Sequence, residues 1–153
     1  MTLNIVFGFV IPWIVALFWV RKAVDVFLLI CPIASVVSLL INQFGFYTTF
    51  WCFTPIIPRI ETISALPLDL GIYPVSASLM IYWIRRNKIK PFWIVIFVSS
   101  IITLLEFMGV LFGKVIYGNG WHVGWTLFSY LLAYGIVYFY YTLLIRNVAI
   151  GRN

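Results

Sequence analysis

The chain has 153 residues, of which 64% are hydrophobic and 9% are charged, and its mean hydropathy is +1.10. A soluble domain carries about a quarter charged residues and could not bury this much apolar surface, whereas a lipid bilayer can solvate it. The net charge of +6 comes from basic residues at the ends of apolar runs, where they meet anionic headgroups. The expected partner is therefore the bilayer and not a nucleic acid.

Five apolar runs each approach the roughly 20 residues that a helix needs to cross the hydrocarbon layer. They predict an all-α polytopic bundle that forms one transmembrane domain over residues 1–153. A further apolar and aromatic segment, residues 45–58, is too short for a crossing and contains Pro55 and Pro58, so an interfacial or re-entrant segment is expected there. No internal repeat is evident. The predicted spans are 3–20, 26–44, 62–84, 92–113 and 123–145.

Basic residues orient this bundle, because cytoplasmic loops of membrane proteins are enriched in Lys and Arg. The bias is strong for loops this short, and it predicts an outer N-terminus and an inner C-terminus. The first run lacks a basic n-region and an A-x-A-like site, so it is expected to stay as a span. The inner connections would hold Arg21, Lys22, Arg85, Arg86, Lys88, Lys90, Arg146 and Arg152, and the outer ones Arg59 and Lys114.

Two of the four acidic residues, Asp69 and Glu106, lie inside predicted spans. An ionised side chain is costly in hydrocarbon, so an intramembrane acid is a candidate functional site. Both acids lie about seven residues from the outer ends of their spans, which places them at one depth, about 10 Å below the interface. Two neighbouring carboxyls in a weakly polar site cannot both ionise cheaply, so one can keep its proton at neutral pH. We expect a shared polar pocket to which His122, Tyr73 or Ser129 supply hydrogen bonds.

The residues around Asp69 support two interpretations. Pro67, Gly71 and Pro74 can interrupt the helix, and broken helices in membranes usually line a cavity or a site. Alternatively, Pro67 is the first helical residue and Asp69 lies in the first turn, where an acid complements the helix dipole. Glu106 has no such alternative, since it lies within its helix.

Small and polar residues recur at spacings of three and four on three of the predicted helices, which places them on one face of each helix. On the fourth span Gly109 and Gly113 form a GxxxG pattern on the face of Glu106, and this pattern predicts close helix packing. The matching residues are Cys31, Ser35, Ser38 and Asn42 on the second span, and Thr126, Ser129, Ala133 and Tyr140 on the fifth.

The single histidine, His122, lies in the connection 114–125, where glycines favour a turn and tryptophans suit the membrane interface. It could sense pH or approach an acid from above, or it could be a solvated interfacial residue. A lone histidine is a poor metal signature, and we expect no metal and no cofactor.

The segment 61–75, with its Pro-x-Asp-Leu element followed by Pro74, together with Glu106 and Trp121, resembles an uncharacterised family of small multi-pass membrane proteins of endospore-forming bacteria. The resemblance covers most of the chain after Glu61. It implies the bacterial cytoplasmic, or inner, membrane, and it implies no activity.

Three functions remain open. The first is a non-enzymatic assembly or partner subunit, as a homo-oligomer or with another membrane protein, since motifs of hydrolases, zinc proteases and P-loops are absent. The second is a proton- or cation-linked permeation subunit that uses Asp69 and Glu106. The third is an intramembrane lipid-modifying enzyme that uses the same acids as acid and base. We predict the first.

Overall fold

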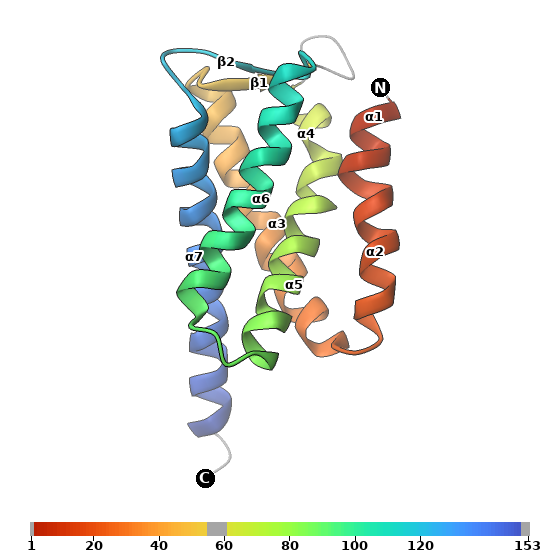
Figure 1. Ribbon diagram of the computed structural model, residues 1–153, viewed down its shortest axis with the longest axis vertical. Helices are drawn as coiled ribbons and strands as arrows, with labels where there is room; N and C mark the ends of the chain where they lie inside the picture. Colours follow the sequence, from red (N-terminus) through yellow and green to blue (C-terminus); the bar gives the residue numbers. More distant parts are fainter. Residues whose placement is uncertain (1, 55–60, 151–153) are drawn as a thin grey trace.

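The structure is a computed structural model that describes residues 2–54 and 61–150. Its helices run side by side along the long axis, and a short two-stranded sheet lies across one end (Figure 1). The N-terminal helix consists of α1 (Thr2–Ile5), a π-helical segment η1 (Val6–Val10) and α2 (Ile11–Val20). The other elements are α3 (Val24–Tyr47), β1 (Trp51–Phe53), α4 (Glu61–Asp69), α5 (Ile72–Arg86), α6 (Pro91–Leu111), β2 (Val115–Tyr117) and α7 (Val123–Ile150).

Four helical segments are long and apolar enough to cross a bilayer, which confirms a membrane helix bundle. They correspond to the second to fifth predicted spans. The N-terminal helix contributes a shorter apolar stretch, Val6–Val20, so a first crossing stays a prediction. The four segments are Val24–Tyr47, Thr62–Arg86, Pro91–Leu111 and Val123–Arg146.

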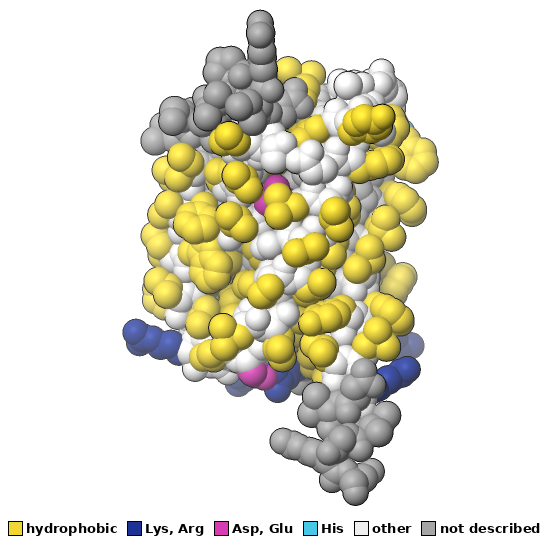
Figure 2. Space-filling model, turned by 180° about the vertical axis from the view of Figure 1, so that it is seen from behind, with side chains coloured by type: hydrophobic (Ala, Val, Ile, Leu, Met, Phe, Trp, Pro, Cys, Tyr) yellow, Lys and Arg dark blue, Asp and Glu magenta, His cyan; other side chains and the backbone are white. Residues whose placement is uncertain are grey.

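The two ends of the bundle differ in charge. Hydrophobic side chains cover the flank in Figure 2, whereas Lys and Arg side chains gather at the end opposite the sheet. At this basic end α5 finishes with Arg85 and Arg86, where cations complement the helix dipole, and Arg85 pairs with Asp25 at the start of α3. The N-terminus lies at the sheet end and the C-terminus at the basic end (Figure 1). This arrangement suits the predicted orientation, which the fold alone does not determine.

A break separates α4 from α5 at Leu70 and Gly71. Pro74 has no N–H group, so the carbonyl of Leu70 lacks its helical donor, and the indole Nε1 of Trp13 donates to it at 2.9 Å. Gly71 lies against the N-terminal helix, because a Cβ at this position would be 2.0 Å from the carbonyl oxygen of Gly8. The broken helix is thus stabilised by the helix beside it.

The alternative in which Pro67 begins the helix is wrong. Pro67 lies inside α4, which already begins at Glu61, and Asp69 is the last residue of α4. An acid at a helix C-terminus is disfavoured by the helix dipole. Asp69 is nevertheless buried, so other elements must supply its stabilising contacts.

The sheet is built on two similar helix ends. After α3, the N–H groups of Thr49 and Phe50 donate to Phe46 and Gly45, and after α6 those of Gly113 and Lys114 donate to Val110 and Gly109. This is the Schellman pattern, and Thr49 and Gly113 hold its left-handed position with φ of 55° and 65°. Each helix end then leads into one strand.

Gly113 therefore ends α6 and does not pack helices as predicted, since a Cβ there would meet nothing within 4 Å. Gly109 does lie against a neighbour, but that neighbour is β2 and not another helix. A Cβ at position 109 would lie 3.1 Å from Cγ2 of Val115.

The strands β1 and β2 pair antiparallel, with Cys52 opposite Ile116. The predicted segment 45–58 thus begins with the last turn of α3 and continues as β1 across the end of the bundle (Figure 1). Pro55 and Pro58 lie outside the described residues. The two helix–strand corners match at a constant offset of 64 residues, from 45 to 109, from 49 to 113 and from 52 to 116. The fold therefore contains a repeat that the sequence does not reveal.

The main apolar core lies between α3, α5, α6 and α7 below this sheet. Met80 and Ile81 of α5 are fully buried in it, and Ala34 and Ala77 allow α3 and α5 to pack closely. A smaller apolar cluster that includes Trp51, Phe53 and Val115 lies at the sheet.

Candidate functional site

Asp69 joins α4 to α3. Its side chain is buried, and its Oδ1 accepts hydrogen bonds from the hydroxyl of Ser38 and from Nδ2 of Asn42, the latter at 2.7 Å. The Oδ1 atom of Asn42 in turn accepts a bond from Nε1 of Trp51 at 3.2 Å. Among the described residues the Oδ2 atom of Asp69 has no hydrogen-bond partner. The carboxyl is therefore held on one side only.

Glu106 joins α6 to α7 and to β2. Its Oε1 accepts bonds from the hydroxyls of Tyr117 at 2.9 Å and Thr126 at 3.4 Å, and its Oε2 accepts one from Tyr130 at 2.5 Å. The Tyr130 hydroxyl is also bonded to that of Tyr73 on α5, 3.0 Å away. Burial raises the pKa of Tyr117, so this phenol keeps its proton and can donate it.

Two tryptophans connect these clusters. The rings of Trp51 and Trp121 lie 4.7 Å apart between centroids, and Nε1 of Trp121 donates to the hydroxyl of Thr126 at 2.9 Å. A cavity of about 20 Å³ lies beside them and is lined by Asn42 and Glu106, among others. It has room for about one water molecule. Asn42, which donates a hydrogen bond to Asp69, thus lies across this small cavity from Glu106.

The predicted site residues are only partly brought together. In the described part of the chain no hydrogen bond joins Asp69 to Glu106. Tyr73 belongs to the Glu106 cluster through Tyr130. Ser129 lines the small cavity, but its hydroxyl donates to the carbonyl of Thr126 on its own helix. His122 is exposed, and its Nδ1 accepts the N–H of Gly124, so the structure does not bring it to either acid.

A second, larger cavity of about 500 Å³ borders Glu106, Tyr73 and Tyr130 on the other side. It lies between the N-terminal helix, the α4–α5 break and α6, and its remaining lining is mostly apolar. Glu106 therefore forms part of the wall of both cavities, whereas Asp69 lines neither.

Sequence reasoning missed most of the donors. Ser38 and Asn42 were assigned to helix packing, although their spacing does place them on the face that meets Asp69. Tyr130 lies one turn after Thr126, so the two share a helix face, and this was the available signal for the Glu106 donors. Nothing in the sequence indicated Trp51 or Tyr117, because they come from strands of three residues.

The two acid clusters offer carboxyl oxygens as hydrogen-bond acceptors and the phenolic hydroxyls of tyrosines. Among the described residues no group of three or more His, Cys, Asp or Glu side chains could hold a metal ion. Comparisons with protein families, with curated proteins and with solved structures found no match for this chain.

Proposed function

We propose that the protein is a non-enzymatic integral membrane subunit that works through assembly, either with copies of itself or with another membrane protein. The observation that carries this proposal is the use of both acids as bridges between elements. Asp69 accepts bonds from α3, and Glu106 accepts bonds from α7 and β2. Such bonds between helices favour a structural role over a catalytic one.

The surface of α7 is available for such a partner. It is the longest helix in the described part of the chain, and only 11% of an apolar 18-residue stretch of it is buried inside the bundle. Its exposed apolar side chains recur along one side, at Phe128, Leu132, Phe139 and Leu143. The resemblance of residues 61–75 supports the bacterial cytoplasmic membrane as the location, and this remains part of the proposal.

A proton- or cation-linked permeation subunit is the second candidate. One observation favours it, which is that Glu106 lines both cavities and is bonded to Tyr130, which borders the larger one and is bonded in turn to Tyr73. Carboxyl groups inside membranes take part in the proton relays of pumps and transporters.

Two measurements on the full-length protein separate the candidates. After extraction from its native membrane in a mild detergent, light scattering should give a protein mass well above the 17.7 kDa of one chain, in a fixed stoichiometry. Vesicles that contain the protein should show no proton or alkali-cation flux above that of empty vesicles. A monomer would contradict the assembly role, and a flux that is lost in Glu106→Gln would establish the second candidate instead.

A further inference from the structure

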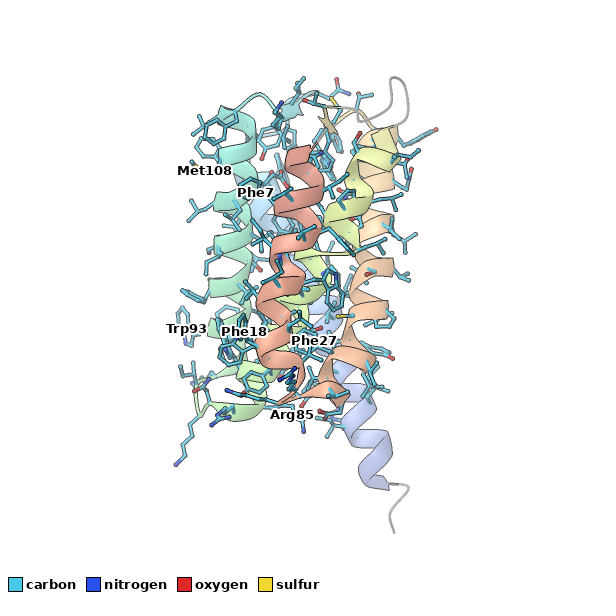
Figure 3. All side chains as sticks on the ribbon, turned by 90° about the vertical axis from the view of Figure 1, so that its right-hand side faces the viewer. Phe7, Phe18, Phe27, Arg85, Trp93 and Met108 are labelled. Atoms are coloured by element: carbon cyan, nitrogen blue, oxygen red, sulfur yellow. The ribbon has the colours of Figure 1, made fainter. Side chains whose placement is uncertain are left out.

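The larger cavity opens towards the lipid. The N-terminal helix packs on α4 and α5, whereas α6 packs on α5, α7 and β2, so a space remains between the N-terminal helix and α6. Figure 3 shows this side, with Phe7 and Met108 on the two flanking helices. Both side chains line the cavity and are about half exposed, at 60% and 47%. An apolar molecule dissolved in the bilayer can therefore enter sideways.

The size and lining of the cavity suit one small ligand. Its volume of about 500 Å³ lies within the range of about 300 to 1,000 Å³ that is usual for ligand pockets. Its wall on α6 extends from Ile102 to Gly109, which is about 10 Å at 1.5 Å per residue, and continues to Phe112 after the helix. Apolar side chains form most of the wall, and within it Tyr73, Tyr130 and Glu106 form one hydrogen-bonded group. This distribution is typical of a site for an amphipathic molecule.

Tyr73 lines the cavity together with Tyr130 and Glu106. Tyr73 is 7% exposed, and its hydroxyl is bonded to Tyr130, which in turn is bonded to Glu106. Tyr130 has only one proton to give. If that proton goes to Glu106, Tyr73 donates to Tyr130 and presents a free lone pair. If Glu106 is protonated and donates to Tyr130, then Tyr130 donates to Tyr73, and Tyr73 has a free proton.

In both arrangements the Tyr73 hydroxyl can form one more hydrogen bond, beside a mostly apolar cavity. A neutral hydroxyl group can complement both arrangements because it both donates and accepts. Lys114 also lines the cavity but is exposed, so an anionic head placed on Tyr73 would lie in a poorly solvated region beside Glu106 and not on Lys114. We propose that the cavity binds a single-chain lipid alcohol, with its hydroxyl group on Tyr73 and its chain passing between Phe7 and Met108 into the bilayer.

The test uses the full-length protein in phospholipid nanodiscs and a hexadecanol analogue with a photoreactive diazirine on its chain. Labelling should saturate, should be competed by unlabelled hexadecanol, and should map to α6 and the N-terminal helix. Tyr73→Phe should weaken binding roughly three- to tenfold, the value of about one hydrogen bond. Tyr134→Phe is the matched control, since the Tyr134 hydroxyl is bonded to Ser76 and does not line this cavity.

A second pair of variants tests the location. Leu105 and Leu104 are adjacent and both exposed on α6, but only Leu105 lines the cavity. Leu105→Trp should therefore abolish saturable labelling, and Leu104→Trp should leave it unchanged. Equal labelling of these two variants would overturn the proposal. If Leu105→Trp does not fold, unchanged affinity in Tyr73→Phe would overturn it equally.

Photoreactive palmitate and a photoreactive phosphatidylcholine distinguish the head group. Unlabelled hexadecanol should compete with the photoreactive alcohol, whereas palmitate should bind more weakly because its carboxylate would lie beside Glu106. Stronger binding of palmitate, especially if it is lost in Lys114→Gln at the rim, would replace the alcohol by an anionic lipid and contradict the proposal. Equal labelling by phosphatidylcholine would show that ordinary bilayer chains fill the cavity, which also contradicts it.

Discussion

Each intramembrane acid is surrounded by neutral donors and not by cations. Glu106 accepts from two phenols and a threonine hydroxyl, and Asp69 accepts from a serine hydroxyl and an amide. The basic side chains in the described part of the chain lie mainly at the opposite end of the bundle (Figure 2). The acids therefore act through hydrogen bonds, and the loss of a donor weakens the stabilisation of a carboxyl oxygen inside the bundle.

Glu106→Gln should keep the fold, because the amide oxygen can still accept hydrogen bonds from the donors to one of the two carboxyl oxygens. We expect a cost of about 1–2 kcal/mol, because the amide NH₂ group would face the donors to the other oxygen. Glu106→Lys should cost several kcal/mol more, since it places an unmatched cation among hydroxyl groups. Thermal unfolding in detergent, followed by size-exclusion chromatography, measures the difference. Equal stability of the two variants would show that this side chain is not enclosed as described.

Ser38→Ala should destabilise the bundle by about 1–3 kcal/mol, because the Asp69 oxygen loses a donor inside the protein. Ser35→Ala is the control, since Ser35 lies about one turn away on the same helix and is less buried. A double-mutant cycle with Asp69→Asn measures the interaction energy between the side chains of Ser38 and Asp69. Additive effects of the two substitutions would contradict a direct bond.

Helix α4–α5 and the N-terminal helix depend on each other. The break exposes a carbonyl that Trp13 satisfies, and Asn4 donates to the carbonyl of Ser64 at 3.2 Å. The π-helical segment η1 contains Gly8, which lies against the break at Gly71. Two irregular segments thus meet at one level, where short side chains allow backbone contact.

Gly71→Ala should therefore separate the N-terminal helix from the break. The added Cβ would lie 2.0 Å from the Gly8 oxygen and 2.6 Å from Cα of Phe9, and neither backbone atom can move aside alone. We expect a loss of about 3 kcal/mol or more, in the range of severe overpacking. Gly135→Ala on α7 meets open space and should be neutral or stabilising by up to about 1 kcal/mol. Thermal unfolding of both variants in detergent is the measurement.

Gly109→Leu should destabilise the sheet end of α6, because the new side chain would meet Val115 of β2. Gly113→Ala should cost about 1 kcal/mol for a different reason, since its φ of 65° suits glycine. Thermal unfolding again gives both values. If Gly109→Leu unfolds like the wild type, the contact between α6 and β2 is absent in the membrane.

The helices were predictable from the sequence because a transmembrane run has a length set by the bilayer. The break was also indicated, since Pro74 and Gly71 each disfavour a regular helix there. The donors to Asp69 and Glu106 were not predictable, because they depend on how each helix is rotated and which helix lies beside it. Strands β1 and β2 are three residues long, so they are too short to give an alternating pattern.

At the level of the whole molecule, the separation of the basic end from the sheet end predicts the orientation in the membrane. In a variant without Cys31 and Cys52, a cysteine at position 119 should react with an impermeant maleimide in intact cells. A cysteine at position 88 should react only after the cells are permeabilised. Labelling at 88 but not at 119 would reverse the proposed topology.

The repeated corners make one chain resemble two fused subunits with an additional helix in front. An antiparallel strand pair has a local two-fold axis, which is also the symmetry of a simple homodimer. In a homodimer of such helix–strand–helix units, positions 42 and 106 would have to carry the same residue, with either two amides or two acids beside the small cavity. A single chain is free of that constraint. This chain carries an amide, Asn42, and an acid, Glu106, at the two matching positions.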